Sequence, residues 1–197
     1  MNWTQLLSPT EIDAGVRAAG QRIVIDYGLR EPGAEIVLVG LLQGGLFFLA
    51  DLARAIGGPA RIATMLPQSY GDGRASSGQV DLARDLSVDI RERHVLVVED
   101  IYDSGRTLRT VCDRLAARGP RSLEVACLIV KDAPRAATVA VRYGLFTVPN
   151  VFVAGCGLDF AGLGRNLPGL WAMPRGLTEQ AALQQLRAQL CGGFETD

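Results

Sequence analysis

The sequence predicts an α/β protein with a largely parallel sheet. Apolar, strand-like runs alternate with segments of helical periodicity along the 197 residues, and this alternation favours parallel strands joined by right-handed crossovers. The apolar run at residues 95–98 is continuous, as expected of a strand buried on both faces. A chain of this length can bury a substantial core in a single domain.

The N-terminal half predicts a helix and then a strand–turn–helix unit. Ser8-Pro9-Thr10-Glu11 has the pattern of a capping box with proline at the first helical position. Apolar residues follow on one helical face as far as Tyr27. Residues 36–42 then predict a buried strand, Gly44-Gly45 a tight turn, and residues 46–56 a helix.

The remaining elements follow the same logic. Strands are predicted at residues 60–66, 80–86, 95–98, 123–130, 144–148 and 151–154, with a helix after Gly105 and a last helix at 178–190. A formal net charge of -1 gives no global basic field that would indicate nucleic acid as a partner. The sequence has no apolar stretch long enough to span a membrane and no signal-peptide pattern at its start, so the cytoplasm is the expected location.

The junction at residues 103–107 has the chemistry of an anion site. It joins the end of a strand to the start of a helix, which is where open α/β sheets bind ligands. Backbone N–H groups and the helix dipole attract anions there, and Ser104 and Thr107 add hydroxyl donors. A phosphate group fits this loop.

Three acids, Glu99, Asp100 and Asp103, lie beside that loop. They would repel a phosphate, so they should face ribose hydroxyls, a metal ion or a proton to be moved. A sugar phosphate satisfies the loop and the acids together. The alternative is a solvated strand end with a helix cap at Ser104, but the acids and the Ser-Gly-x-Thr pattern occur in register, which favours the functional interpretation.

The segment VLVVEDIYDSGRT resembles the phosphoribosyl pyrophosphate signature of type I phosphoribosyltransferases. Four more stretches resemble the hypoxanthine or hypoxanthine-guanine branch, in the expected order: LLQGGLFFLADLAR, QSYGDGRASSGQV, VKDAPR and VAGCGLDFAGLGRNLP. Together they cover about residues 35–170. Five motifs in order are much more specific than any one of them.

The resemblance implies a type I phosphoribosyltransferase fold in one domain, with a mostly parallel central sheet flanked by helices and a small hood. The core would span about residues 31–134, the hood about 1–30 and 135–175, and a C-terminal helix about 178–190. The implied reaction is purine salvage: a 6-oxopurine base displaces pyrophosphate from phosphoribosyl pyrophosphate to give a nucleoside 5′-monophosphate. Mg²⁺ is the implied cofactor, and a homodimer or homotetramer the implied assembly, with no nucleic-acid or membrane partner.

The resemblance also assigns roles to the acids and the loop. Asp103 matches the catalytic base or acid that faces an imidazole nitrogen of the purine. Glu99 and Asp100 match the acids that hold the ribose hydroxyls, directly or through Mg²⁺. The 5′-phosphate loop corresponds to Ser104, Gly105, Arg106 and Thr107.

Three further matches concern the purine base. Lys131 matches the donor to the 6-oxo group, which would reject adenine because a 6-amino group offers no acceptor. Phe152 matches the aromatic residue that stacks on the base, and Val153 the position whose backbone contacts the base edge.

The other matches lie toward the pyrophosphate. Gly44 matches a backbone donor in the pyrophosphate loop, and Arg165 an arginine that clamps pyrophosphate. Asp159 matches a Mg²⁺ ligand. Ser69 and Tyr70 match the start of a loop that closes over the reaction.

Three departures from the family pattern remove positive charge. Gln43 replaces a common lysine, residues 65–68 are uncharged, and Asp132 follows Lys131 where a basic residue is frequent. Weaker pyrophosphate binding is therefore expected. Two other functions stay open: a nucleotide-binding regulator with this fold, which the balanced charge disfavours, and a transferase for another base such as xanthine or a pyrimidine.

Overall fold

The computed structural model describes residues 3–69, 80–84, 86–174 and 176–192. Its main sheet has the strand order β4-β3-β2-β5-β6-β7. The strands are β2 (Ile36–Leu41), β3 (Ala60–Ser69), β4 (Val80–Arg84), β5 (His94–Tyr102), β6 (Ser122–Asp132) and β7 (Tyr143–Pro149). All neighbours pair in parallel except β4, which is antiparallel to β3 at one edge. The predicted α/β class with a mostly parallel sheet is confirmed.

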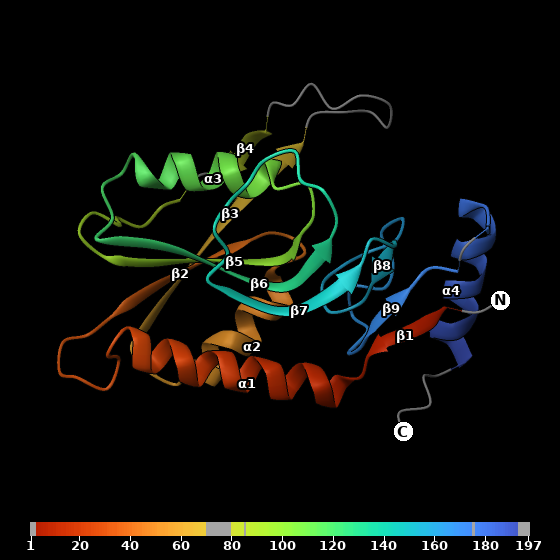
Figure 1. The fold of residues 1–197 in the computed structure, drawn as a ribbon, viewed down its shortest axis with the longest axis horizontal. Coiled ribbons are helices and arrows are strands. Elements are labelled where there is room, and N and C mark those ends of the chain that lie inside the picture. The colour runs from red at the N-terminus through yellow and green to blue at the C-terminus, as the bar shows by residue number, and fades with distance from the viewer. Residues whose placement is uncertain (1–2, 70–79, 85, 175, 193–197) are drawn as a thin grey trace.

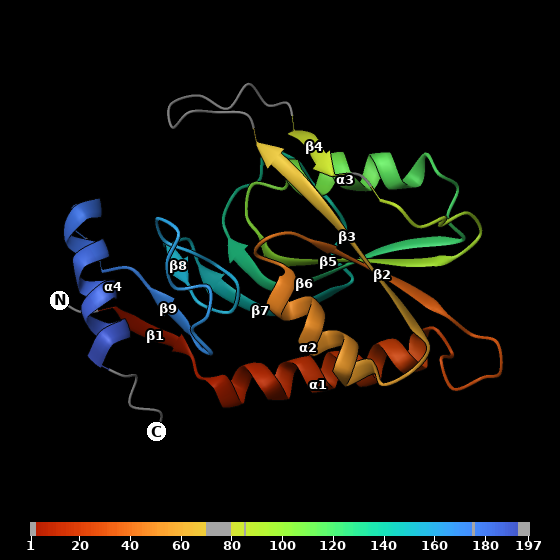
Figure 2. The same ribbon diagram turned by 180° about the vertical axis from the view of Figure 1, so that it is seen from behind.

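Helices cover both faces of this sheet. Helices α1 (Pro9–Asp26) and α2 (Leu46–Ile56) lie on one face, and α3 (Arg106–Ala116) lies on the other (Figures 1 and 2). Alternate residues along each strand supply the two cores: in β2, Leu38 packs with the α1 and α2 side and Val39 with the α3 side. Burial on both faces explains why the strand sequences are continuous apolar runs.

The start of α1 confirms the predicted capping box. The Glu11 backbone N–H donates to Ser8 Oγ at 3.2 Å, and the Ser8 N–H donates to Glu11 Oε2 at 2.8 Å. These two bonds satisfy donors that a helix terminus otherwise leaves without partners. The strand–turn–helix unit from β2 to α2 also lies where the sequence predicts it.

A second, smaller sheet forms the other lobe. It has the order β1-β9-β8, from β1 (Thr4–Leu7), β9 (Leu170–Ala172) and β8 (Val153–Ala154). Helix α4 (Glu179–Gly192) joins it, and Trp3 Nε1 donates to the carbonyl of Ala182 at 3.1 Å. This lobe sits at one end of the molecule's long axis (Figure 1).

Elements from both ends of the chain also join the main sheet. Helix α1 packs against α2, and β7 pairs with β6 at the edge of this sheet. The small sheet includes β1, which was not predicted as a strand.

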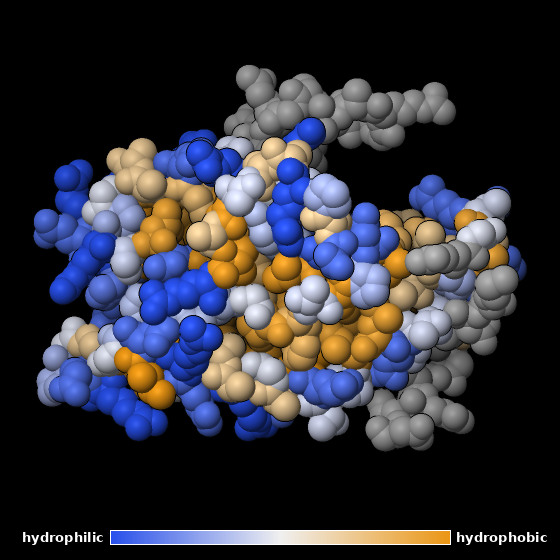
Figure 3. Space-filling view, viewed as in Figure 1, coloured by the Kyte–Doolittle hydropathy of each residue, from blue (hydrophilic) through white to orange (hydrophobic). Residues whose placement is uncertain are grey.

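The front face combines apolar and charged areas. Figure 3 shows apolar side chains gathered near its middle, where β7 adjoins the small sheet, with hydrophilic side chains around them. Among the described residues, no helix is both long and apolar enough to cross a membrane.

Candidate active site

A cavity of about 260 Å³ opens at the carboxyl ends of β2 and β5. The chain continues from β2 toward β3 on one side and from β5 toward β6 on the other, so these neighbouring strands form the topological switch point of the sheet. Ligands of open α/β sheets bind at such points. The predicted residues that line the cavity are Gly44, Glu99, Asp100, Asp103, Ser104, Gly105 and Thr107.

The turn at Gly105 exposes the start of α3. Gly105 has a left-handed backbone (φ 79°) and caps the helix, with no side chain bonded to the first helical N–H groups. A Cβ atom at this position would lie 1.9 Å from the carbonyl oxygen of Ala137. The turn therefore needs glycine, and its geometry suits the binding of an anion at the helix N-terminus.

Glu99 and Asp100 lie within β5, where the sequence had suggested a strand end before them. Their exposed fractions are only 8% and 7%. Burial, followed by the negative charge of Asp100, raises the pKa of Glu99. Burial also raises the pKa of Asp100, and the charge of Arg165 opposes that rise. The pair is thus poised to bind hydroxyl groups or a cation.

The loop at Gly44 is packed between Asp100 of β5 and the turn at Gly157. A Cβ atom on Gly44 would lie 1.8 Å from Asp100 Oδ2, and one on Gly157 would lie 2.0 Å from the carbonyl oxygen of Gly44. The peptide bond between Leu42 and Gln43, just before Gly44, is cis. Gly157 was not predicted as a site residue, since nothing in its sequence context distinguishes it from an ordinary turn glycine.

Arg165 connects this loop to Asp159. Its Nη1 donates to the carbonyl of Gly157 at 2.7 Å, and its Nη2 lies 2.5 Å from Asp159 Oδ1. Asp159 Oδ2 also accepts the Gly162 N–H at 2.8 Å. The two residues matched to pyrophosphate and Mg²⁺ therefore form an ion pair with each other, next to Gly157.

Asp103 and Lys131 form a direct ion pair. Lys131 Nζ donates to Asp103 Oδ2 at 2.8 Å, with the lysine side chain only 11% exposed and the aspartate 51% exposed. Sequence matching gave these residues separate roles, and the structure brings them together at the mouth of the cavity. Side by side they present a donor and an acceptor.

Other predicted residues lie outside this cavity. Phe152 is 45% exposed and makes an edge-on contact with Phe160, with ring centroids 5.1 Å apart. Val153 is buried in β8. Arg106 is the first residue of α3.

The predicted closing loop is only partly described. Ser69 is the last residue of β3, but its side chain, Tyr70 and residues 71–79 lie outside the described part of the chain.

The sequence did not single out Tyr102 or Pro67, which also line the cavity. Tyr102 is the last residue of β5 and is buried. Its hydroxyl accepts the Val139 N–H at 2.8 Å, so it anchors the segment that follows β6. In the sequence, Tyr102 stands between Asp100 and Asp103 and looks like a continuation of the apolar strand, so nothing marks it as a site residue.

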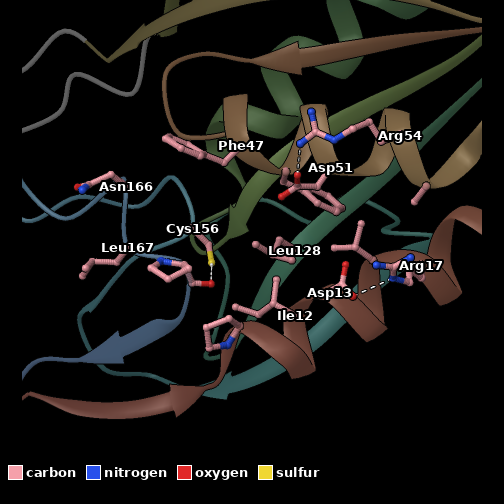
Figure 4. Close-up of a pocket in the computed structure, with 15 residues that line it drawn as sticks. Ile12, Asp13, Arg17, Phe47, Asp51, Arg54, Leu128, Cys156, Asn166 and Leu167 are labelled. Atoms are coloured by element: carbon pink, nitrogen blue, oxygen red, sulfur yellow. Dashed lines mark hydrogen bonds and ion pairs between the residues drawn. The ribbon is translucent and has the colours of Figure 1, made fainter. Parts of the chain in front are cut away.

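A larger cavity of about 550 Å³ lies between α1, α2 and the loop around residues 156–168 (Figure 4). Its charged side chains pair with each other: Arg17 with Asp13, and Arg54 with Asp51. The rest of its lining is largely apolar. Because it holds neither the acids nor the anion loop, we assign the chemistry to the smaller cavity.

The described residues contain no group of three or more acidic, histidine or cysteine side chains that could hold a metal ion. Neither Glu99 nor Asp100 has an ion-pair partner within 4 Å among them. Mg²⁺ commonly binds through one or two carboxylates, with the remaining ligands from phosphates and water. Glu99 and Asp100 fit that mode of binding. The described residues do not provide enough side-chain ligands for a site made of protein groups alone.

Comparison with known proteins agrees with this geometry. Residues 2–161 match the family model described as phosphoribosyl transferase domain. A hypoxanthine phosphoribosyltransferase of Salmonella typhimurium is 40% identical over 163 residues, covering 83% of this chain and 90% of the relative. A hypoxanthine-guanine phosphoribosyltransferase of Mycobacterium avium is 41% identical over 157 residues, covering 79% and 77%.

Solved structures show the same likeness. A crystal structure of a Bacillus anthracis hypoxanthine-guanine phosphoribosyltransferase superposes with a TM-score of 0.81 at 32% identity. The match covers 88% of this chain and all of that one. The likeness therefore extends over most of the chain.

Proposed function

The chain belongs to the phosphoribosyltransferase family, and from this premise we infer that it is a purine-salvage enzyme of the hypoxanthine(-guanine) branch. It transfers the phosphoribosyl group of phosphoribosyl pyrophosphate to hypoxanthine or guanine and releases pyrophosphate. The observation that carries this proposal is the Asp103–Lys131 pair, which lies beside an uncapped helix N-terminus and two buried acids.

The sugar phosphate would occupy the 260 Å³ cavity. Its 5′-phosphate binds at the start of α3, where Ser104 and Thr107 add hydroxyl donors to the backbone N–H groups. Its ribose hydroxyls donate to Glu99 and Asp100. As the bond to pyrophosphate breaks, the ribose gains positive charge, and these buried carboxylates stabilise it.

The base would meet the Asp103–Lys131 pair. In a 6-oxopurine, O6 and N7 lie side by side on one edge of the ring system. Lys131 donates to O6, while Asp103 accepts the proton from the imidazole nitrogen as the bond to ribose forms. Adenine offers an amino group in place of O6, so Lys131 would lose its acceptor. Phe152 supplies an exposed aromatic face for stacking, and Val153 a backbone contact at the base edge.

Mg²⁺ would be held by the two acids Glu99 and Asp100, and Asp159 would offer a separate carboxylate ligand on the pyrophosphate side. When bound with the substrate, it supplies positive charge for the leaving pyrophosphate. Arg165 and the backbone N–H of Gly44 bind the same group from the protein side. Ser69 and Tyr70 begin the segment proposed to close over the reaction.

Gln43→Lys should strengthen pyrophosphate binding. Residue 43 directly precedes Gly44, whose position against Asp100 fixes this loop, and a lysine there would add one positive charge near the leaving group. We expect the inhibition constant for pyrophosphate to fall several-fold, which corresponds to about 1 kcal/mol, the upper range for an exposed ion pair. Product inhibition by pyrophosphate measures it; an unchanged constant would mean that other groups already supply the contact. Gln21→Lys, at an exposed position of α1 that does not line this cavity, adds the same charge elsewhere and should leave the constant unchanged.

We also propose a homodimer or homotetramer. Leu46 and Phe47 at the start of α2 are 49% and 40% exposed, and Phe47 lines the largely apolar cavity of Figure 4. Exposed apolar residues beside a groove are typical of a subunit interface. Sedimentation velocity should give a particle mass of more than one chain, and Phe47→Glu should shift that mass toward the mass of the monomer. A monomeric wild-type protein would refute this assembly.

The proposed reaction is tested by turnover with separate bases. Purified protein is supplied with phosphoribosyl pyrophosphate and Mg²⁺, and then with hypoxanthine, guanine, xanthine, adenine or uracil. Nucleoside monophosphate should form from hypoxanthine or guanine, and formation should stop when the metal is chelated. Turnover only with xanthine or uracil would assign another base. Binding of phosphoribosyl pyrophosphate without turnover of any base would refute the enzyme and favour a regulator.

A further inference from the structure

The end of β6 and the residues that follow it fold back onto the phosphate loop. We call residues 131–139 the strap. The backbone N–H groups of Ala136 and Ala137 both donate to the carbonyl of Ser104 at 3.0 Å. The strap is thus hydrogen-bonded to the loop through its backbone, and these bonds do not depend on its side chains.

Arg135 lies at the centre of the strap, and no step proposed above uses it. Its Cζ lies 4.4 Å from the centroid of the Tyr102 ring, and its Nη2 donates to the carbonyl of Lys131 at 2.8 Å. Its Nε is buried and has no hydrogen-bond partner in the described part of the chain. A buried donor without a partner is unfavourable, so the other contacts of this guanidinium must hold it in place.

These contacts link the two halves of the base-binding pair. Tyr102 directly precedes Asp103 in the chain, and the carbonyl that Arg135 binds belongs to Lys131, whose ammonium group meets Asp103. Arg135 therefore contacts the ring of Tyr102 on one side of the 2.8 Å ion pair and the backbone of Lys131 on the other. A planar guanidinium suits both contacts, because its flat face stacks on the ring while its N–H groups donate in the plane to the carbonyl.

We propose that Arg135 is a positioning residue for purine recognition: it holds Lys131 and Asp103 in register and so sets the affinity for the base. The inference rests on the proposed function. Loss of the Arg135 side chain should lower the affinity for the base but not for phosphoribosyl pyrophosphate. The phosphate loop keeps its backbone hydrogen bonds to Ala136 and Ala137 in such a variant.

Steady-state kinetics of Arg135→Gln and Arg135→Lys test the proposal. In both variants KM for hypoxanthine should rise about tenfold, the size expected when one well-placed polar contact is lost. KM for phosphoribosyl pyrophosphate should stay near the wild-type value. Lysine should not rescue the base affinity, since it keeps the charge but lacks the planar group. Because it is the milder change, it also provides the test if the glutamine variant does not fold.

A double-mutant cycle shows whether Arg135 acts through Lys131. In a Lys131→Met background, Arg135→Gln should no longer raise KM for hypoxanthine, because its target is already gone. Additive effects would overturn the proposal. So would equal rises in the KM values for both substrates, which would indicate general damage to the site.

Arg22→Gln is the matched control. Arg22 also stacks on a tyrosine, with Cζ 5.6 Å from the Tyr143 ring, but it lies on α1, away from the cavity. Its loss should leave both KM values unchanged. If the wild-type protein turns over no base, the proposed function fails. If it is active and the Arg135 variants keep the wild-type KM for hypoxanthine, only this inference fails.

Discussion

Replacing Asp103 by asparagine should lower kcat by roughly 10²- to 10⁴-fold, the usual contribution of a positioned acid or base. Asparagine keeps the size of the side chain and one oxygen near Lys131, but it cannot accept the purine proton. The affinity for phosphoribosyl pyrophosphate should change little, because the acids and the phosphate loop remain. Product formation measures kcat, and isothermal titration with phosphoribosyl pyrophosphate measures binding.

Asp132→Asn provides the control for charge. Asp132 ends β6 next to Lys131 and is exposed, so this change alters the net charge at the same edge of the sheet by the same amount. Its kcat should equal that of the wild type. Near-normal turnover in Asp103→Asn would remove Asp103 from the proton-transfer role.

Gly105→Ala should raise KM for phosphoribosyl pyrophosphate about 100-fold, comparable to losing one or two charge-assisted hydrogen bonds. The new methyl group would meet the carbonyl oxygen of Ala137 at 1.9 Å. Both the strap and the loop are backbone at this point, so neither side can yield by a side-chain rotation. The loop must move, and the donors for the 5′-phosphate move with it.

Gly119→Ala separates this effect from ordinary backbone strain. Gly119 has a similar left-handed backbone (φ 67°), at the far end of α3, and a Cβ atom there would meet nothing within 4 Å. This variant should lose about 1–2 kcal/mol of unfolding free energy and keep a normal KM. If Gly105→Ala binds phosphoribosyl pyrophosphate normally, the phosphate does not bind at the start of α3.

Local sequence signals predicted most of the main sheet. Strands buried on both faces produce continuous apolar runs, and the Ser8–Glu11 capping box marks the start of α1 within the sequence itself. The small sheet carries no such signal. Strand β1 pairs with β9 in the register Thr4 to Ala172, a contact between the two ends of the chain that neither short segment reveals alone.

The site divides in the same way. Asp103, the phosphate loop and the paired acids share one segment, so their order along the chain indicates their common chemistry. The ion pair between Asp103 and Lys131 depends on the parallel pairing of β5 with β6. The contacts of Arg135 and Gly157 depend on how loops fold back over strand ends, and sequence spacing does not encode those approaches.

A competition assay tests the central claim, that the Asp103–Lys131 pair selects a 6-oxopurine. Equal concentrations of hypoxanthine and adenine are mixed with limiting phosphoribosyl pyrophosphate, Mg²⁺ and the wild-type protein, and the nucleotides formed are separated and quantified. The predicted product is inosine monophosphate, with adenosine monophosphate at background level. Comparable amounts of the two nucleotides, or no nucleotide at all, would contradict the claim.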